Sequence, residues 1–177
     1  VREGVSGMNT ESSIILIGMP GVGKTTVGKR LADVLGFSFV DTDRLIEAAQ
    51  QCDLQTLLDA HGYQALRDIE QQCILASQFN RAVVATGGSA VYGEQAMQHL
   101  QRSGTIIYLT ASIDTLRQRI SNWQSRGIAC PAGQSPESIY AERVPLYQRY
   151  ADYRIETDAI TTGQVVTKIL SLWPQGD

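Results

Sequence analysis

The chain has 177 residues, a formal net charge of −3, 43% hydrophobic residues and 19% charged residues. This composition is ordinary for a soluble globular protein, and the length suits one domain with a substantial core. The weakly acidic balance gives no reason to expect nucleic acid or an anionic membrane as a partner. No apolar stretch approaches the roughly 20 residues of a transmembrane helix. We therefore expect neither a nucleic acid nor a membrane as a partner.

Residues 1–7 have no periodic pattern and precede Met8. We therefore expect residues 1–12 to form a disordered or added N-terminal segment, and residues 13–177 to form the folded domain. The three cysteines are odd in number and lack the spacing of a metal site. Because nothing in the sequence resembles a secretory signal, we expect a cytoplasmic protein.

The first predicted strand, Ile14–Ile17, runs into a complete phosphate-binding loop. From Gly18 to Thr25 the residues follow the pattern Gly-x-x-x-x-Gly-Lys-Thr. Its glycines allow backbone N–H groups to converge on one anion, and the helix expected over Lys24–Leu35 adds the positive end of its dipole. Lys24 can reach the β- and γ-phosphates, and the Thr25 hydroxyl can bind Mg²⁺. The residues expected to bind the nucleoside triphosphate are Gly21, Val22, Gly23, Lys24, Thr25 and Thr26.

Further strands are expected at short apolar runs, with helices between them. The later predicted strands are Phe37–Val40, Ala82–Ala85, Thr105–Leu109 and the weaker Tyr153–Glu156. The later predicted helices are Thr42–Gln50, Asp53–His61, Tyr63–Ser77, Glu94–Arg102, Ile113–Ser121, Pro136–Tyr150 and Thr162–Leu172. Ser112 and Ser135 stand where they can cap two of them. Continuous apolar strands that alternate with helices indicate a parallel sheet covered on both faces, so the sequence predicts a three-layer α/β domain of the phosphate-loop type.

The stretch Asn122–Gln134 differs from the rest of the chain because it contains Gly127, Pro131 and Gly133 and has no periodicity. A connection of this length in a compact domain is often a lid or a binding loop. It also contains Arg126, and phosphoryl transfer needs water excluded and positive charge on the transferring group. We therefore expect a lid over about residues 122–134, with an exposed basic loop as the alternative.

The second predicted strand runs into Asp41-Thr42-Asp43. In an open parallel sheet the carboxyl ends of strands face the ligand crevice, so these carboxylates can approach the phosphate loop. If the chain stays extended, Asp41 and Asp43 point the same way. One could hold Mg²⁺ through water while the other accepts a proton from an attacking hydroxyl. The alternative is that one of them merely caps the helix that begins near Thr42.

Two further features are compatible with ligand binding. Gly87 and Gly88 follow the third predicted strand, where a glycine pair suits close approach of the backbone to a ligand, although tight turns use the same pair. Arg67 and Arg143 lie in predicted helices. Each arginine could bind an anion, or could instead pair with an acid on its own helix.

Five motifs, taken in order and at their intervals, resemble the shikimate kinase family. They are Gly-x-Pro-Gly-x-Gly-Lys-Thr-Thr, Asp-Thr-Asp, Leu-Arg-x-x-Glu, Gly-Gly-x-Ala-Val and Arg-x-Pro-Leu-Tyr, spread over about Ser13 to Leu172. The resemblance implies a five-stranded sheet of order 2-3-1-4-5. It also implies an ATP- and Mg²⁺-dependent kinase of aromatic amino acid biosynthesis that transfers the γ-phosphate to a hydroxyl of shikimate, and a monomer.

On the acceptor side, the resemblance implies that Asp43 contacts the hydroxyls of the substrate and acts as the base or close to it. It implies that Arg67 and Arg143, together with the backbone of Gly87 and Gly88, hold the carboxylate of the substrate. Two guanidinium groups on one carboxylate form charge-assisted hydrogen bonds, which position the acceptor hydroxyl for transfer.

On the donor side, the resemblance implies that Asp41 belongs to the magnesium shell with Thr25. Arg119 matches the arginine that stacks on adenine, and Arg126 matches the lid arginine that reaches the phosphates. The catalytic residues implied by the resemblance are Lys24, Asp43 and Arg126.

The chain departs from the family pattern at three places. The stretch Arg126–Ala129 reads Arg-Gly-Ile-Ala where the family usually has Arg-Pro-Leu-Leu. Ser89 stands where the family has a third glycine, and Leu66 where it usually has phenylalanine. These changes spare the residues of phosphoryl transfer but leave open another small hydroxylated anion as acceptor. A catalytically inactive nucleotide-binding regulatory protein is the remaining alternative.

Overall fold

A computed structural model describes residues 12–120 and 127–173 of the chain. Apart from Ser12, the predicted N-terminal segment lies outside these ranges, and so does Arg126 of the predicted lid. The strands are β1 (Ser13–Ile17), β2 (Ser38–Asp41), β3 (Ala82–Ala85), β4 (Gly104–Thr110) and β5 (Tyr153–Glu156). The helices are α1 (Lys24–Leu35), α2 (Thr42–Gln50), α3 (Leu54–Ala76), the 3₁₀ turn η1 (Ala90–Tyr92), α4 (Glu94–Ser103), α5 (Ile113–Arg119), α6 (Pro136–Tyr150) and α7 (Thr162–Leu172).

The strands form one parallel sheet in the order β2-β3-β1-β4-β5, which confirms the predicted order. In the centre, Ile15 of β1 pairs with Val84 of β3 on one side and with Ile106 of β4 on the other. Every residue of β1 and β3 is buried, because helices cover both faces of the sheet. This burial explains why these strands read as unbroken apolar runs.

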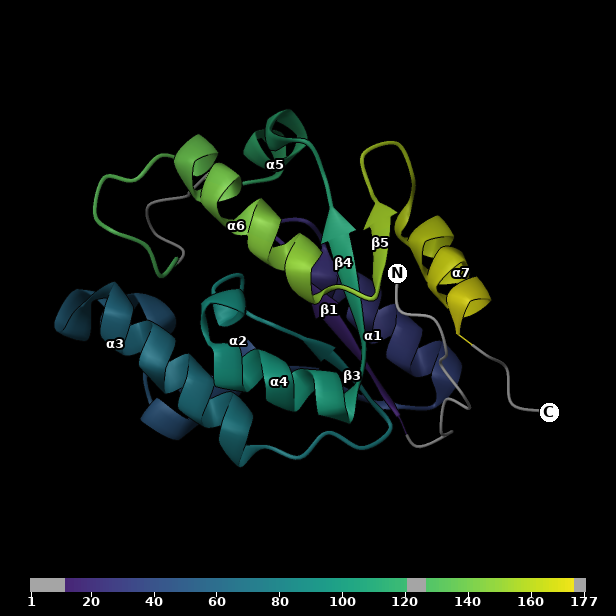
Figure 1. Cartoon of the computed structure of the whole chain (residues 1–177), viewed down its shortest axis with the longest axis horizontal. Helices are drawn as coiled ribbons and strands as arrows, with labels where there is room; N and C mark the ends of the chain where they lie inside the picture. The colour runs from purple at the N-terminus through teal and green to yellow at the C-terminus, as the bar shows by residue number, and fades with distance from the viewer. Residues whose placement is uncertain (1–11, 121–126, 174–177) are drawn as a thin grey trace.

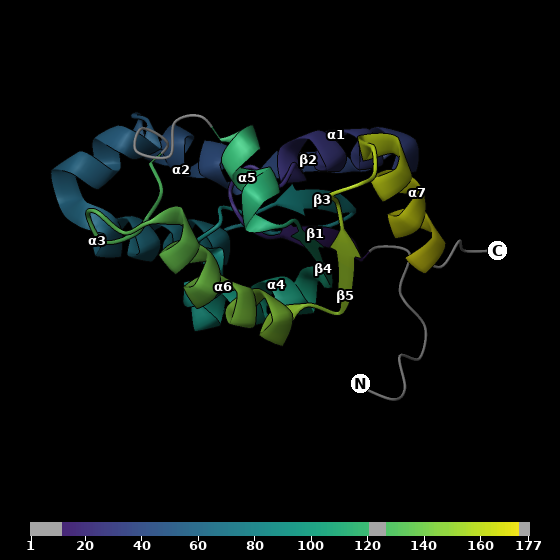
Figure 2. The ribbon, with the colours of Figure 1, turned by 90° about the horizontal axis from the view of Figure 1, so that it is seen from above.

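The helices form the two outer layers of the domain. Figure 2 shows α1 and α7 on one face of the sheet, and α4 and α6 on the opposite face. Helices α2 and α3 pack against each other at one end of the molecule (Figure 1). The carboxyl ends of the strands and the start of α2 therefore border the same space.

Most predicted boundaries hold to within two residues. The two helices predicted on either side of Gly62 are confirmed: both lie within α3, which is interrupted at Gly62 because its φ of 81° is not α-helical. The turn η1 was not predicted, since so short a turn has no periodicity to read. The predicted caps are confirmed: Ser112 accepts from the N–H of Thr115, and Ser135 from that of Ser138.

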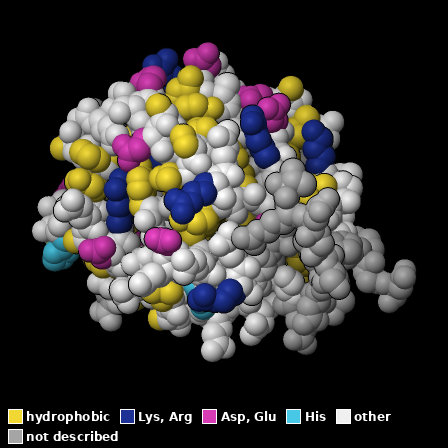
Figure 3. Space-filling model, viewed as in Figure 1, with side chains coloured by type: hydrophobic (Ala, Val, Ile, Leu, Met, Phe, Trp, Pro, Cys, Tyr) yellow, Lys and Arg dark blue, Asp and Glu magenta, His cyan; other side chains and the backbone are white. Residues whose placement is uncertain are grey.

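Within residues 12–120 and 127–173, no helix is both long enough and apolar enough to cross a membrane. On the face shown in Figure 3, acidic and basic side chains are interspersed and apolar side chains lie between them.

Candidate active site

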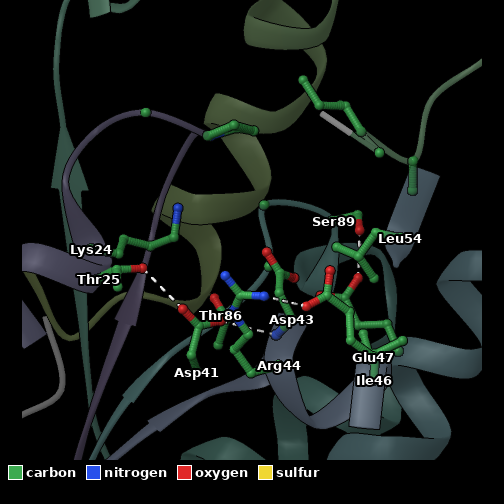
Figure 4. Close-up of a pocket in the computed structure, with 18 of the residues that line it drawn as sticks. Lys24, Thr25, Asp41, Asp43, Arg44, Ile46, Glu47, Leu54, Thr86 and Ser89 are labelled. Carbon is green, nitrogen blue, oxygen red and sulfur yellow. Dashed lines mark hydrogen bonds and ion pairs between the residues drawn. The ribbon is translucent and has the colours of Figure 1, made fainter. Parts of the chain in front are cut away.

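The carboxyl ends of β1, β2 and β3 open onto a cavity of about 750 Å³. Figure 4 shows Lys24 and Thr25 on one side of it and Ser89 on the other, with Asp41 and Asp43 between them. The predicted site residues that line the cavity are Gly21, Gly23, Lys24, Thr25, Thr26, Asp41, Asp43, Gly87, Gly88, Arg119 and Arg143. The cavity therefore brings most of the predicted donor and acceptor residues together. Val22 and Arg67 are not part of its lining, and Arg126 lies outside the described residues.

Lys24 begins α1, and its side chain folds back over the phosphate loop. Its Nζ donates to the carbonyl oxygens of Gly18 at 2.7 Å and Met19 at 2.9 Å. Burial lowers the pKa of Lys24 to about 8, against the raising effect of the Asp43 carboxylate nearby. Gly23 precedes the helix with a φ of 106° and has no side chain to cap it. The first N–H groups of α1 are thus left for an anion, which is the arrangement of phosphate-binding helix starts.

The Asp41 carboxylate makes two hydrogen bonds, one at the start of α2 and one to the phosphate loop. Its Oδ1 accepts the N–H of Asp43 at 3.1 Å, so Asp41 caps α2. Its Oδ2 accepts from the hydroxyl of Thr25 at 3.0 Å, so the same carboxylate faces the phosphate loop. These two oxygen side chains are the type of donor that Mg²⁺ prefers, and a Mg²⁺ site commonly takes few protein ligands, with water and phosphate oxygens as the rest.

Asp43 lines the cavity from the helix that the sequence predicts over Thr42–Gln50. The chain does not stay extended after Asp41, because α2 begins at Thr42. Asp43 therefore projects from the first turn of a helix. Burial raises its pKa to about 6, and the negative charge of Asp41 adds to this effect. A carboxylate with a pKa near the working pH is suited to accept a proton from a hydroxyl.

Arg67 of α3 and Arg143 of α6 converge on one atom, the carbonyl oxygen of Ala129. Arg67 donates to it from Nε at 3.2 Å and from Nη2 at 3.0 Å. Arg143, which is only 1% exposed, donates from Nη2 at 3.0 Å. Among the ion pairs of the described residues none involves either arginine, so the alternative of pairing along the helix is wrong there. We call Arg67 and Arg143 the arginine clamp.

Glu70 is a site residue that sequence reasoning missed as such. It is 3% exposed and accepts a hydrogen bond from the Ser89 hydroxyl, while its Oε1 has no hydrogen-bond partner among the described residues. Burial raises its pKa to about 7, and the negative charge of Asp43 adds to this effect. The spacing of Glu70 from Arg67 on one helix was a signal that both face the same side. It could not show that this side is buried.

Side chains of the site lie close against both residues of the glycine pair. A Cβ on Gly87 would lie 2.3 Å from Glu70 Oε1 and 2.7 Å from Asp43 Oδ1. A Cβ on Gly88 would lie 2.9 Å from Arg143 Nη1. The N–H of Gly87 already donates to the Thr42 hydroxyl at 2.9 Å. The glycines therefore let the carboxylates and the clamp approach one turn of backbone.

Gly127 stands where the family lid has proline, and its conformation excludes proline. Its φ is 61°, whereas the proline ring holds φ near −65°. Its N–H donates to Gln55 Oε1 at 2.8 Å, and proline has no N–H to donate. A Cβ would also lie 2.7 Å from the Cβ of Leu54. The N–H of Gly127 thus links this segment to the start of α3.

Arg119 links the phosphate loop to the end of the last strand. Its guanidinium donates to the carbonyl oxygens of Val22 and Thr157, both at 3.3 Å. Val22 itself is buried, and its carbonyl oxygen accepts from Arg119. Arg119 also lines the cavity.

A glycine loop at the end of the central strand, with a lysine folded over it and carboxylates at the end of β2 and the start of α2, defines a phosphate-loop phosphotransferase. The family model described as "Shikimate kinase" matches residues 20–173. A shikimate kinase of Thermodesulfovibrio yellowstonii is 36% identical over 163 residues, covering 89% of this chain and 92% of the relative. The chain belongs to the shikimate kinase family and is a phosphotransferase with an alcohol acceptor.

Solved structures agree with this assignment. A structure described as shikimate kinase from Acinetobacter baumannii in complex with shikimate is 31% identical, with a TM-score of 0.81, and 92% of this chain and 93% of that chain are covered. A shikimate kinase from Aquifex aeolicus, 24% identical with a TM-score of 0.76 over 90% of this chain and 94% of that chain, shares the fold.

Proposed function

We propose that the protein transfers the γ-phosphate of ATP to a hydroxyl of shikimate in the presence of Mg²⁺. The observation that carries the proposal is the convergence of both clamp arginines on one oxygen atom, that of Ala129. Two guanidinium groups aimed at one point suit a carboxylate, which shikimate has. The carboxylate of the acceptor takes the place of the Ala129 carbonyl when it binds.

On the donor side, the phosphate loop over Gly21–Thr26 and the Nζ of Lys24 bind the triphosphate, and Arg119 contacts the adenine. Thr25 and Asp41, already joined by a hydrogen bond of 3.0 Å, would hold Mg²⁺. The ion would supply positive charge to the phosphate oxygens. Arg126 of the lid adds a further positive charge to the transferring group.

On the acceptor side, Asp43 accepts the proton of the attacking hydroxyl at its carboxylate. The arginine clamp and the turn at Gly87 and Gly88 orient the substrate so that this hydroxyl faces the donor phosphate. A new phosphorus–oxygen bond forms as ADP leaves. Because little covalent chemistry falls to the protein, positioning is its main contribution.

A coupled assay of ADP release with ATP, Mg²⁺ and shikimate tests the proposal. We expect turnover with shikimate, a product heavier by one phosphoryl group, and loss of turnover in Asp43→Asn. Absence of turnover at millimolar shikimate would refute it. Hydroxy acids and sugar acids in the same assay test the alternative of another acceptor, and a complete lack of ATP turnover would favour the inactive regulatory protein. The relatives lend support to shikimate over both alternatives.

The remaining expectations stay predictions: one domain over residues 13–177 with a lid, a monomer, a cytoplasmic location, and no nucleic-acid or membrane partner. Light scattering on the purified chain tests the monomer, and we expect the mass of a single 19.4 kDa chain.

A further inference from the structure

One aromatic ring contacts both arginines of the clamp. Tyr92 ends η1, directly after the turn that carries Gly88. The Cζ of Arg67 lies 3.6 Å from the centre of the Tyr92 ring, and the Cζ of Arg143 lies 5.4 Å from it. Both distances are within the range in which the electron-rich face of a ring attracts a cation.

The ring of Tyr92 is itself held at both ends. Its backbone N–H donates to the carbonyl oxygen of Ser89 at 3.0 Å. Its hydroxyl donates to Glu142 Oε1, and Glu142 is the residue before Arg143. The other oxygen of Glu142 accepts from Gln134 Nε2 at 3.0 Å. The ring therefore joins the glycine turn to the first half of α6.

A ring suits this position better than an acid would. Two guanidinium groups that converge on one oxygen repel each other, so something must hold them together. A carboxylate would do so by taking up their N–H groups, which are the groups that an acceptor anion needs. An aromatic face attracts the cations without cancelling their charge. The Tyr92 hydroxyl interacts with the Arg143 guanidinium as well as with Glu142, and the change of Tyr92 to phenylalanine removes that hydroxyl but keeps the face.

We propose that Tyr92 is a positioning residue of the acceptor site, whose ring holds Arg67 and Arg143 together for the carboxylate of the acceptor. The inference rests on the proposed function, because it takes the clamp to bind the acceptor. Tyr63 contributes a second ring to Arg67, at 4.9 Å. Tyr92 is the ring that links this arginine to Arg143.

The test replaces Tyr92 by phenylalanine and then by phenylalanines with increasing numbers of ring fluorines. Fluorine withdraws electrons from the ring face while the shape stays close to that of phenylalanine, so folding is preserved. The KM for the acceptor should rise stepwise with fluorination, by about 3- to 30-fold over the series, while the KM for ATP stays within about twofold. Tyr92→Phe separates the hydroxyl from the ring, and the same fluorinated residues at Tyr153 on β5 are the matched control.

A second measurement uses the free protein and needs no acceptor. The NMR order parameter of the Arg67 Nε–H group should fall along the fluorination series, while that of Arg119 stays constant. The proposal would be overturned if neither the KM for the acceptor nor the order parameter of Arg67 changed with fluorination. It would also be overturned if the KM for ATP rose as much as the KM for the acceptor. Lack of turnover in the unmodified protein would instead refute the proposed function, and the Arg67 signal would still test the role of Tyr92.

Discussion

The donor and acceptor halves of the cavity are built in different ways. The phosphate loop is one continuous stretch, Gly18–Thr26, in which backbone groups and a helix start form the binding surface. The acceptor half is assembled from α2, α3, the turn after β3 and α6, together with the segment around Ala129. Its polar side chains meet each other across long separations in sequence.

This difference explains where the chain can depart from its family. All three departures lie outside the phosphate loop. At Ala129 the arginine clamp contacts the backbone carbonyl, so a change of side chain there does not remove the contact. At Ser89 the added hydroxyl is taken by Glu70. The acceptor half thus accommodates one change through a backbone contact and the other through a neighbouring side chain.

The largest effect is expected in the donor half. Lys24→Ala should lower kcat on the order of 10³-fold, because it removes the charge aimed at the phosphates. Cooperative unfolding should persist, since the side chain contacts loop carbonyls and not the apolar core. Steady-state kinetics and thermal unfolding measure both, with the exposed Lys168→Ala on α7 as control. A variant that loses cooperative unfolding would contradict this view of the donor half.

Next in size is the clamp. Arg143→Ala should raise the KM for the acceptor by about 10- to 150-fold, the equivalent of one or two hydrogen bonds to a charged group, and the KM for ATP much less. Arg143→Lys should recover only part of the loss, since lysine lacks the planar fork. The exposed Arg149→Ala on the same helix is the matched control. An equal rise of the KM for ATP and the KM for the acceptor would contradict a separate acceptor half of the cavity.

A smaller effect is expected on stability at Glu70. Its folded pKa of about 7 lies above the ordinary value of 4.5, so the wild-type protein loses stability as the pH rises between these two values. Glu70→Gln lacks this loss and should be more stable than wild type at pH 8, by about 1 to 3 kcal/mol. Below pH 4.5 the gain should vanish. Urea unfolding at both pH values measures it, and a gain that persists at low pH would contradict the titration.

The smallest effect is expected at Ser89. Ser89→Ala removes the hydrogen bond to Glu70 and should cost about 1 kcal/mol of stability. Ser89→Gly should lower the free energy of unfolding somewhat more than Ser89→Ala. Ser89 has a φ of −92°, which any residue can adopt, so glycine brings no benefit to the folded state and gives the unfolded chain more backbone freedom. Both variants should change the acceptor KM by less than about threefold. A larger change would show that the hydroxyl contacts the acceptor.

Sequence patterns predicted the phosphate loop at the end of β1, together with the strands, most helix bounds and the caps. These features depend on residues that are close in the chain. They are an apolar run, the spacing of glycines, and a serine that caps a helix by accepting the N–H of the residue three positions later. A helix cap by one of the two aspartates was weighed as an alternative, and only the structure shows that Asp41 caps α2 and also accepts a hydrogen bond from Thr25. Tyr92 was missed because nothing in its neighbourhood in the sequence points to the arginines it contacts.

The sequence by itself determined the layered parallel sheet and the phosphate loop, because local hydrogen bonding and apolar periodicity specify both. The tertiary structure decided that Glu70 is buried, that carboxylates crowd Gly87, and that two distant arginines meet at one atom. Burial and contact between distant segments follow from how the helices pack on the sheet. The acceptor half of the site exists only once that packing is complete.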